Sequence, residues 1–402
     1  MSPAIRMKRP WRVQMVVDGD QEYFREVMLG ARRRAFESGR LEFVDRWLPH
    51  EQQDGGLRAL AARDGVRGIV ASVHTAAREA EFFGLGLPVI NVSNSLLAPR
   101  LPVVTQDDRE VGRLAAEHLL GRGLRSFLFL GQAKARYSEE RRAGFVEALG
   151  VAGARCETVV MASTLTGLGT KGADTRRIRA ALAGLERPAG VFAVLDSYAL
   201  AIMRIARETG WDVPGELAVL GAGDDDFFVE FERTPLSSIR LPARRIGYEA
   251  AALLESLLAK KPRRAAAGAA PVVALPGSRV VARRSTEILA PGDPLVARAA
   301  ALMRENPAAR VTDIARACGV ARSGLQRRFI AALGHGMLEE RRRVRLARAE
   351  ALLAGSDAKL SAIAQEAGYP SAQRLAADLR RAHGRTPGRW RRETVRGVPT
   401  MM

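Results

Sequence analysis

The sequence is poor in cysteine and histidine, and this scarcity excludes several classes of site. Its two cysteines, Cys156 and Cys318, lie far apart and form neither a metal-binding spacing nor a disulfide framework, which fits a reducing compartment. The five histidines show no H-x-x-x-H or H-E-x-x-H pattern. We therefore predict no metal site and no cofactor.

Long apolar runs are missing as well. No run reaches the roughly 18 residues that a helix needs to span a bilayer. The apolar stretch near the N-terminus ends after a few residues at Asp18, too early for a secretory signal. These absences predict a cytoplasmic protein without a membrane partner.

Positive charge is abundant and unevenly placed. The 402 residues carry a formal net charge of +19, and residues 293–402 hold 21 Lys and Arg against 10 Asp and Glu. More than half of the excess therefore lies in a small part of the chain. A general preference for arginine would explain the choice of residue but not its concentration at one end. That concentration is typical of a nucleic-acid-binding module.

Within this basic region the same pattern occurs twice. In residues 311–334 a short helix is followed by a turn at Gly319 and a basic second helix, and residues 360–384 repeat this order around Gly368. Glycine suits both turns because it adopts left-handed backbone geometry at little cost. The repeat predicts two helix-turn-helix units joined by a long helix over residues 337–353.

The second helix of each unit is expected to expose polar and basic side chains. Because arginine can bind guanine and glutamine can bind adenine in a bidentate way, side chains near each helix start are candidates for base contacts. These candidates are Arg322, Ser323, Gln326, Arg327, Ser371, Gln373 and Arg374. The candidates for phosphate contacts lie further along: Arg328, Arg380 and Arg381. For any single arginine, a purely solvated side chain is the alternative.

The same residues carry a family resemblance. The pattern I-A-x-x-x-G-V-x-R-S-x-L-x-x-x-F, the helix RLARAEALL, the segment IAQEAGYPS and the terminal TPGRWR resemble the DNA-binding domain of the AraC family. Leu375 and Leu379 stand where members of that family usually have phenylalanine, and leucine keeps both positions apolar. The resemblance implies an all-α domain with two helix-turn-helix units and double-stranded DNA as its partner.

The preceding part of the chain follows a different pattern. Short β-branched runs, beginning with a strand at residues 12–17, alternate with helical stretches. Repeated β-α-β units predict parallel sheets with helices on both faces, and the length of this part favours two similar lobes. Polar breaks at residues 106–108 and 234–235 are the predicted crossings between the lobes. Such sheets bind ligands at the carboxyl ends of their strands.

This part resembles the periplasmic-binding-protein-like sensor domains of LacI-type regulators. The resemblance rests on GLPVINVSNS, TQDDREVGRLAAEHLLGRGLRSFLFLG, RRAGF, VPGELAVLGAGDDD and TPLSSIRLPARRIGYEAAALL. A sensor followed by an AraC-type domain is also similar to the order in XylR-like regulators. It implies a sensor domain at residues 11–286, a linker at 287–293 and a DNA-binding domain at 294–394. The implied partners are operator or promoter DNA, a monosaccharide effector such as xylose, a second copy of the chain, and RNA polymerase.

Candidate ligand-binding residues follow the strands of this sensor. Sugar hydroxyls can donate to carboxylates and accept from arginine, and tyrosine rings can stack on a sugar face. By resemblance, Arg141 stands where sugar-sensing relatives place a ligand-binding arginine. The full set of candidates is Asp18, Asp20, Tyr23, Ser72, Tyr137, Arg141, Asp196 and Asp224. Because aspartate and serine also favour turns and caps, a purely structural role is the alternative for each of them.

Two other functions are open at this point. Residues 167–172 match G-x-G-x-x-G after a strand-like segment, and Asp196 ends the next strand, which is the outline of an NAD-linked α/β enzyme. Several loop residues precede the first glycine, however, so the tight turn of a dinucleotide site is not required. A ligand-independent architectural DNA-binding protein would leave the first part of the chain without a role. The sequence therefore favours a transcription regulator that responds to a ligand and is not an enzyme.

Overall fold

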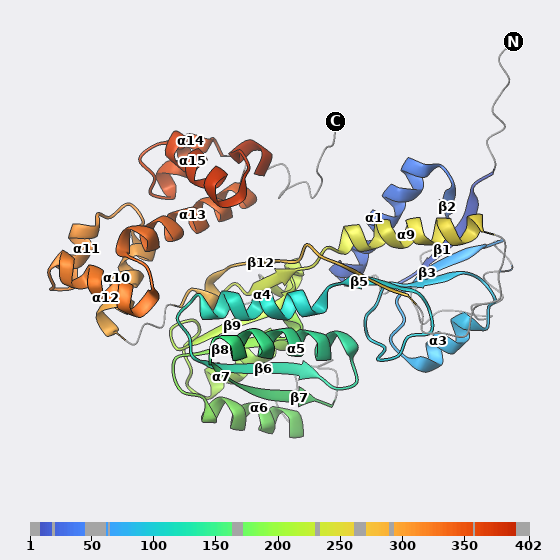
Figure 1. The fold of residues 1–402 in the computed structure, drawn as a ribbon, viewed down its shortest axis with the longest axis horizontal. Helices are drawn as coiled ribbons and strands as arrows, with labels where there is room; N and C mark the ends of the chain where they lie inside the picture. Colours follow the sequence, from blue (N-terminus) through green and yellow to red (C-terminus); the bar gives the residue numbers. More distant parts are fainter. Residues whose placement is uncertain are drawn as a thin grey trace, which may run out of the picture. The chain divides into compact units, whose positions relative to one another are not determined.

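The structure is a computed structural model that describes residues 9–17, 21–44, 62, 65–162, 172–229, 234–260, 271–288, 293–356 and 358–390. The chain divides into two compact units, Met1–Ile288 and Leu289–Met402 (Figure 1). The predicted linker at residues 287–293 spans this division, and its bounds stay a prediction. None of the described helices is long and apolar enough to cross a membrane.

The first unit contains two six-stranded sheets, each the centre of a lobe. The sheet of the first lobe is parallel and has the order β11-β5-β4-β3-β1-β2. Its strands are β1 (Trp11–Val16), β2 (Leu41–Phe43), β3 (Gly68–Ala71), β4 (Val89–Asn91), β5 (Val103–Gln106) and β11 (Val272–Leu275). Its helices are α1 (Glu22–Ser38), α3 (Ala76–Phe83) and α9 (Ala243–Ala259).

Alternating strand residues give the first lobe a core on each face of its sheet. Val70 of β3 packs in the core that α1 and α9 cover, whereas Ile69 and Ala71 pack with Phe82 of α3. Successive side chains of a strand point to opposite faces, so a strand buried on both faces is apolar throughout. The continuous apolar runs in the sequence have this origin.

Helices α1 and α9 cross in direct backbone contact. A Cβ added at Gly30 would lie 1.8 Å from the Arg244 carbonyl oxygen, and one at Gly247 would lie 1.8 Å from the Val27 carbonyl oxygen. Both glycines are therefore required, because any side chain would push the two helices apart.

The second lobe has the same plan with one reversed edge strand. Its sheet order is β12-β10-β9-β8-β6-β7, parallel except that β12 is antiparallel to β10. Its strands are β6 (Ser126–Gln132), β7 (Arg155–Met161), β8 (Ala189–Ala193), β9 (Leu217–Gly223), β10 (Ser237–Arg240) and β12 (Arg279–Val281). Its helices are α4 (Asp108–Leu120), α5 (Arg136–Val151), α6 (Ala173–Gly184), α7 (Asp196–Glu208), α8 (Asp226–Val229) and the 3₁₀ turn η1 (Arg284–Thr286).

A second glycine-lined crossing joins α4 to α5. A Cβ at Gly112 would lie 2.0 Å from the Arg141 carbonyl oxygen, and one at Gly144 would lie 2.1 Å from the Arg109 carbonyl oxygen. This contact fixes the backbone of Arg141. At the other face of α5, Phe145 packs against Phe192 with ring centroids 5.3 Å apart.

The chain crosses between the lobes three times: from β5 to α4, from β10 to α9, and from β11 to β12. The predicted crossing at residues 106–108 is confirmed by the first of these. The predicted crossing at residues 234–235 is wrong, because β10 follows it and pairs with β9 in the second sheet. The chain therefore stays in the second lobe past the Thr-Pro break.

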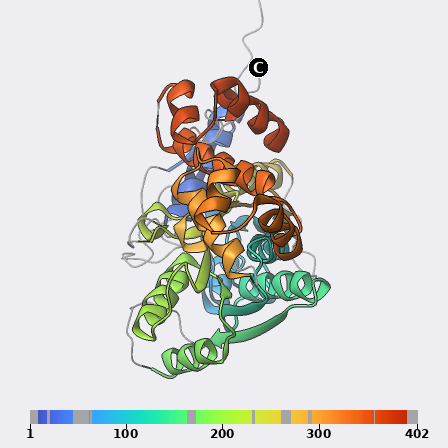
Figure 2. The same ribbon diagram turned by 90° about the vertical axis from the view of Figure 1, so that its left-hand side faces the viewer.

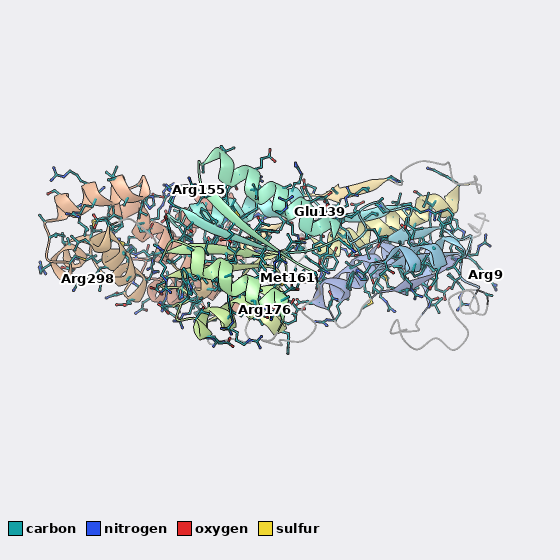
Figure 3. All side chains as sticks on the ribbon, turned by 90° about the horizontal axis from the view of Figure 1, so that it is seen from below. Arg9, Glu139, Arg155, Met161, Arg176 and Arg298 are labelled. Atoms are coloured by element: carbon teal, nitrogen blue, oxygen red, sulfur yellow. The ribbon has the colours of Figure 1, made fainter. Side chains whose placement is uncertain are left out.

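The carboxyl ends of the second sheet face the first lobe. Figure 3 shows this for β7, whose last residue, Met161, lies nearer to the first lobe than its first residue, Arg155. Loops after the strands therefore meet loops of the first lobe, which is where a parallel sheet places a ligand.

The second unit is helical in the part that the structure describes (Figure 2). Its helices are α10 (Pro294–Glu305), α11 (Val311–Ala317), α12 (Arg322–Leu333), α13 (Met337–Gly355), α14 (Leu360–Glu366) and α15 (Ala372–His383). Gly319 and Gly368 occupy the turns with φ values of 71° and 78°. Helix α13 contributes Met337 to one core, around α10 to α12, and Leu353 to the other, around α14 and α15. The predicted two helix-turn-helix units and their joining helix are confirmed.

Candidate functional site

A cavity of about 550 Å³ lies between the two lobes of the first unit. Both sheets contribute strand-end loops to its wall. From the first lobe these are Gln21, Tyr23, Phe24, His74, Val92, Ser93, Asn94, Ser95 and Gln106. From the second lobe they include Gln132, Lys134, Tyr137, Arg141, Leu195, Asp196, Gly223, Asp225 and Phe228. A cavity of this size with several polar groups is suited to a small polar molecule.

Arg141 of α5 is held rigidly at this wall. Its side chain is 2 % exposed; Nε donates to Asp108 Oδ1 at 2.7 Å, and Nη1 donates to the Val194 carbonyl oxygen at 2.6 Å. Asp108 also accepts from Asn94 Nδ2 at 2.8 Å and from Gln106 Nε2 at 2.9 Å. Burial raises the pKa of Asp108, whereas the guanidinium of Arg141 lowers it. The network preorganises the arginine before any ligand arrives.

Two tyrosines flank this network. Tyr23 donates its hydroxyl to Gln106 Oε1 at 3.1 Å, and Tyr137 donates its hydroxyl to Gln132 Oε1 at 2.5 Å. The guanidinium carbon of Arg141 lies 5.3 Å from the centroid of the Tyr137 ring. Burial raises the pKa of both phenols, so they stay neutral at ordinary pH. The wall thus offers two uncharged rings beside a fixed cation.

Asp196 begins α7 and supplies a buried carboxyl group to the cavity. Its Oδ1 accepts from Ser238 Oγ at 2.5 Å, and its Oδ2 accepts from the Asp225 backbone N–H at 3.2 Å. Gly221 leaves room for it, because a Cβ there would lie 2.2 Å from Asp196 Oδ1. Burial raises the pKa of Asp196 from 3.8 to about 7.

The structure brings together four of the eight predicted ligand-binding residues. Tyr23, Tyr137, Arg141 and Asp196 line the cavity. Asp18 and Asp20 lie outside the described residues. Their contribution to the cavity stays a prediction.

Ser72 and Asp224 do not belong to the cavity wall as the described residues form it. Asp224 turns away from the cavity: its Oδ1 accepts from Arg283 Nη1 at 2.7 Å and its Oδ2 from Arg240 Nε at 2.5 Å. The next residue, Asp225, lines the cavity in its place. The structure therefore gives no support to ligand binding by Asp224.

Several wall residues were not among the predicted set. Four of them follow strands of the first lobe or of the second: His74 after β3, Asn94 after β4, Gln106 at the end of β5 and Gln132 at the end of β6. The strand-end rule that selected Asp196 applies to each of them, so extending it to amides and histidine would have found them. Asn94 Oδ1 is buried and has no hydrogen-bond partner among the described residues. It is an acceptor that a ligand hydroxyl can satisfy.

The second unit carries the predicted DNA-binding residues on α12 and α15. All but Gln326 are exposed: Arg322, Ser323, Arg327, Arg328, Ser371, Gln373, Arg374, Arg380 and Arg381. Ser371 also caps α15, because its Oγ accepts from the Arg374 backbone N–H. The N-terminal ends of both helices thus present donors suited to DNA.

Several of the predicted DNA-binding residues have partners inside the unit, and Arg374 and Arg381 both pair with Asp378. Gln326 is half-buried and its Oε1 accepts from the Met337 backbone N–H at 3.0 Å, so it caps the start of α13. Arg328 Nη1 donates to Asp293 Oδ2 at 2.6 Å. For Gln326 this placement favours a structural role over a base contact.

Comparison with known proteins agrees with this architecture. The family described as periplasmic binding protein-like domain matches residues 116–286, and the helix-turn-helix domain family matches residues 314–393. With the two-lobed α/β unit and the double helix-turn-helix unit, these matches define a DNA-binding transcription regulator that is similar to XylR-like regulators. The predicted fold class is confirmed.

Individual proteins resemble the chain over most of its length or over a smaller part of it. It is 27% identical over 395 residues to the xylose operon regulatory protein of Escherichia coli (strain K12), covering 94% of this chain and 96% of that protein. The Haemophilus influenzae protein of the same name is 26% identical over 314 residues, covering 76% and 79%. Among solved structures, a xylose-binding transcription activator is similar with a TM-score of 0.59 and 25% identity, covering 94% and 97%. A LacI family regulator from Enterococcus faecium with bound ribose shares the fold of the first unit: TM-score 0.51, 21% identity, covering 69% and 99%.

Proposed function

We propose that this chain regulates transcription under the control of xylose or a related monosaccharide that binds between the two lobes. The observation that carries the proposal is the cavity wall, where Arg141, Asn94 and Asp196 are fixed by hydrogen bonds beside Tyr23 and Tyr137. The names of the similar proteins, a xylose operon regulatory protein and a xylose-binding transcription activator, support the choice of sugar.

The wall has the mixed chemistry that a sugar requires. A sugar hydroxyl both donates and accepts, so a ring of hydroxyls needs acceptors and donors in alternation. Asp196 and Asn94 Oδ1 provide acceptors, and Arg141 and Lys134 provide donors. Phe24 and Phe228 supply apolar surface for the carbon face of the ring. A ligand with one strong charge would need an excess of the opposite charge, whereas this wall contains both signs.

Binding, and not catalysis, is the proposed activity. The G-x-G-x-x-G segment that suggested an NAD-linked enzyme lies at residues 167–172, of which 167–171 fall outside the described residues. Asp196, the acid that would bind a ribose in that reading, faces the cavity between the lobes with both oxygens engaged by Ser238 and Asp225. A sugar that closes the lobes can act only through its different affinities for two states of the chain.

The remaining partners follow from the same proposal. Helices α12 and α15 would enter successive major grooves of operator DNA, about one helical turn or ~34 Å apart. A second copy of the chain would supply a second half-site, and RNA polymerase would be the target of an activating complex. The protein would work in the cytoplasm, where this DNA is found.

The direct test is a thermal-shift and calorimetric titration of the full chain with D-xylose, D-ribose, L-arabinose and NAD. One monosaccharide should raise the melting temperature, because a ligand at a hundred times its Kd stabilises the folded state by about 2.7 kcal/mol. A rise with NAD and with no monosaccharide would replace the proposal by the enzyme alternative.

A pair of variants on α5 locates the effect. Arg141→Lys should abolish the sugar-dependent rise, because lysine cannot hold Asp108 and the Val194 carbonyl together. Arg142→Lys makes the same change at the next, exposed position and should leave the rise intact. If the two substitutions changed the sugar-dependent rise equally, Arg141 would not be a ligand-binding residue.

A further inference from the structure

A line of hydrogen bonds leads away from the cavity through the second lobe. Asp196 Oδ1 accepts from Ser238 Oγ at 2.5 Å, and the same hydroxyl oxygen accepts from the Asp224 backbone N–H at 3.0 Å. The carboxylate of Asp224 then binds two arginines, Arg283 through Oδ1 and Arg240 through Oδ2. Its side chain is fully buried, with 0% exposure.

Arg283 binds the last segment of the first unit, residues 283–288, to the second lobe. Its Nη1 also donates to the Leu236 carbonyl oxygen at 3.0 Å, and its backbone N–H donates to Ser237 Oγ at 2.8 Å. Two residues later, Ser285 donates its hydroxyl to the Val219 carbonyl oxygen at 2.6 Å. The segment is therefore bound to β9 and β10 by polar contacts.

Thr286 completes this attachment. Its Oγ1 lies 2.7 Å from Ser237 Oγ and 2.9 Å from His118 Nε2 of α4. Ser285 and Thr286 are both fully buried, and the first unit ends at Ile288. Ser285 and Thr286 are thus held in the second lobe only a few residues before the DNA-binding unit begins at Leu289.

Packing alone does not explain this arrangement. An apolar segment would attach a strand edge at less cost than a buried carboxylate with two guanidinium groups. Asp224 also has a φ of 57°, a left-handed value that is costly for a residue other than glycine. Strained backbone and buried charged residues are commonly found at functional sites.

The hydroxyl of Ser238 connects Asp196 to Asp224 and can respond to a ligand. With its single hydrogen directed at Asp196, its lone pairs are available to the Asp224 N–H. A sugar hydroxyl that donates to Asp196 competes with Ser238 for the same oxygens. A shift of Ser238 then acts on Asp224, and through it on Arg283.

We propose that Asp224 and Arg283 are coupling residues that transmit occupancy of the cavity to the start of the DNA-binding unit. This rests on the proposed function, because it needs a sugar beside Asp196. It assigns the two arginines of Asp224 different roles. Arg283 lies in the segment that precedes the DNA-binding unit. Arg240 ends β10, from which the chain crosses to α9 of the first lobe.

The test compares Arg283→Met with Arg240→Met in the full chain, since each removes one guanidinium from the same carboxylate. D-xylose binding is measured by calorimetry. DNA binding is measured by fluorescence anisotropy, with and without saturating D-xylose, on a duplex that the wild-type chain selects from a random pool. If another monosaccharide binds in place of D-xylose, the same comparison is made with that sugar.

In the wild-type chain, the sugar should change the Kd for DNA by a factor within about 5 to 150. Arg283→Met should bind the sugar with the wild-type affinity, but the sugar should leave its Kd for DNA nearly unchanged. Arg240→Met should keep the wild-type factor. The role of Arg283 would be overturned if the sugar changed the Kd of Arg283→Met for DNA as much as it changes that of the wild type. It would also be overturned if both variants lost this response equally.

Hydrogen exchange of the wild-type chain keeps the test independent of how the variants fold. The backbone amides of Arg283 and Ser285 should change their exchange rates when D-xylose is added, because both donate to groups of the second lobe. Unchanged rates in a sample that binds the sugar would overturn the coupling and leave the proposed function standing. Absence of binding by every monosaccharide would overturn both.

Discussion

Asp196 is the residue where the cavity and the proposed coupling meet. It is buried, it faces the cavity, and both of its oxygens accept hydrogen bonds from the second lobe. Burial raises its pKa to about 7, so its charge changes around neutral pH. A sugar hydroxyl that donates to Asp196 favours the ionised form, and binding should therefore release protons below neutral pH.

The raised pKa of Asp196 predicts a pH dependence of stability. The folded state keeps a proton that the unfolded state loses near pH 3.8, so the stabilisation is fully present below that pH and is lost as the pH rises to about 7. The whole change is on the order of 4 kcal/mol. Asp196→Asn should lack it, so the wild type should lose stability relative to the variant as the pH rises. Urea unfolding of both proteins across this range measures the difference, and parallel profiles would contradict the prediction.

The neighbouring acids show what the sequence could and could not predict at this scale. The strand-end rule correctly directed attention to the loop after β9. It could not decide between Asp224 and Asp225, because the left-handed backbone at Asp224 determines which side chain faces the cavity. The two arginines that bind Asp224 lie 16 and 59 residues away along the chain. Such distant partners leave no local pattern.

At the scale of elements, α12 and α15 follow the same sequence pattern but differ in which polar residues are available. Gln326 lies in the second turn of α12 and Gln373 in the first turn of α15, and both were predicted to contact bases. Gln326 is half-buried and hydrogen-bonds the start of α13, whereas Gln373 is exposed. A helical repeat predicts the helices but not the contacts that a neighbouring helix makes.

The difference between these helices predicts three distinct outcomes for DNA binding. Gln373→Ala should weaken binding to a selected duplex by roughly 1–3 kcal/mol and leave binding to unrelated DNA nearly unchanged. Arg381→Ala should weaken both alike, because a phosphate contact carries no sequence information. Gln326→Ala, the matched control, should lower the melting temperature without changing the ratio of the two affinities. Competition assays with both duplexes measure the ratio, and equal ratios in all three variants would contradict the role of Gln373.

Strand order in the two sheets could likewise be predicted only in part from the sequence. Alternation of apolar strands and helices predicted parallel sheets in two lobes, and both are present. The antiparallel edge strand β12 and the third crossing, from β11 to β12, were not predicted. Strand order depends on pairing between distant segments, for which a single sequence contains no direct signal.

At the scale of the whole molecule, the proposed control requires that sugar and DNA affect each other equally. If D-xylose tightens DNA binding by some factor, saturating DNA must tighten D-xylose binding by the same factor, because both measure one coupling free energy. Calorimetric titration of the full chain with D-xylose, with and without the selected duplex, gives the second factor. A sugar affinity that ignores the DNA, in a chain whose DNA affinity responds to the sugar, would indicate a kinetic effect or a second site.

The paired glycines at the helix crossings restrict how the sensor can move. In each lobe two helices touch backbone to backbone, through Gly30 and Gly247 in the first and through Gly112 and Gly144 in the second. Helices in such contact have no layer of side chains between them on which to slide, which disfavours shear at these two crossings. We therefore expect that any opening and closing of the lobes is a hinge rotation, absorbed by a few backbone torsions in the three connecting segments. A substitution in one of those segments would change how readily the lobes rotate while leaving both interiors intact.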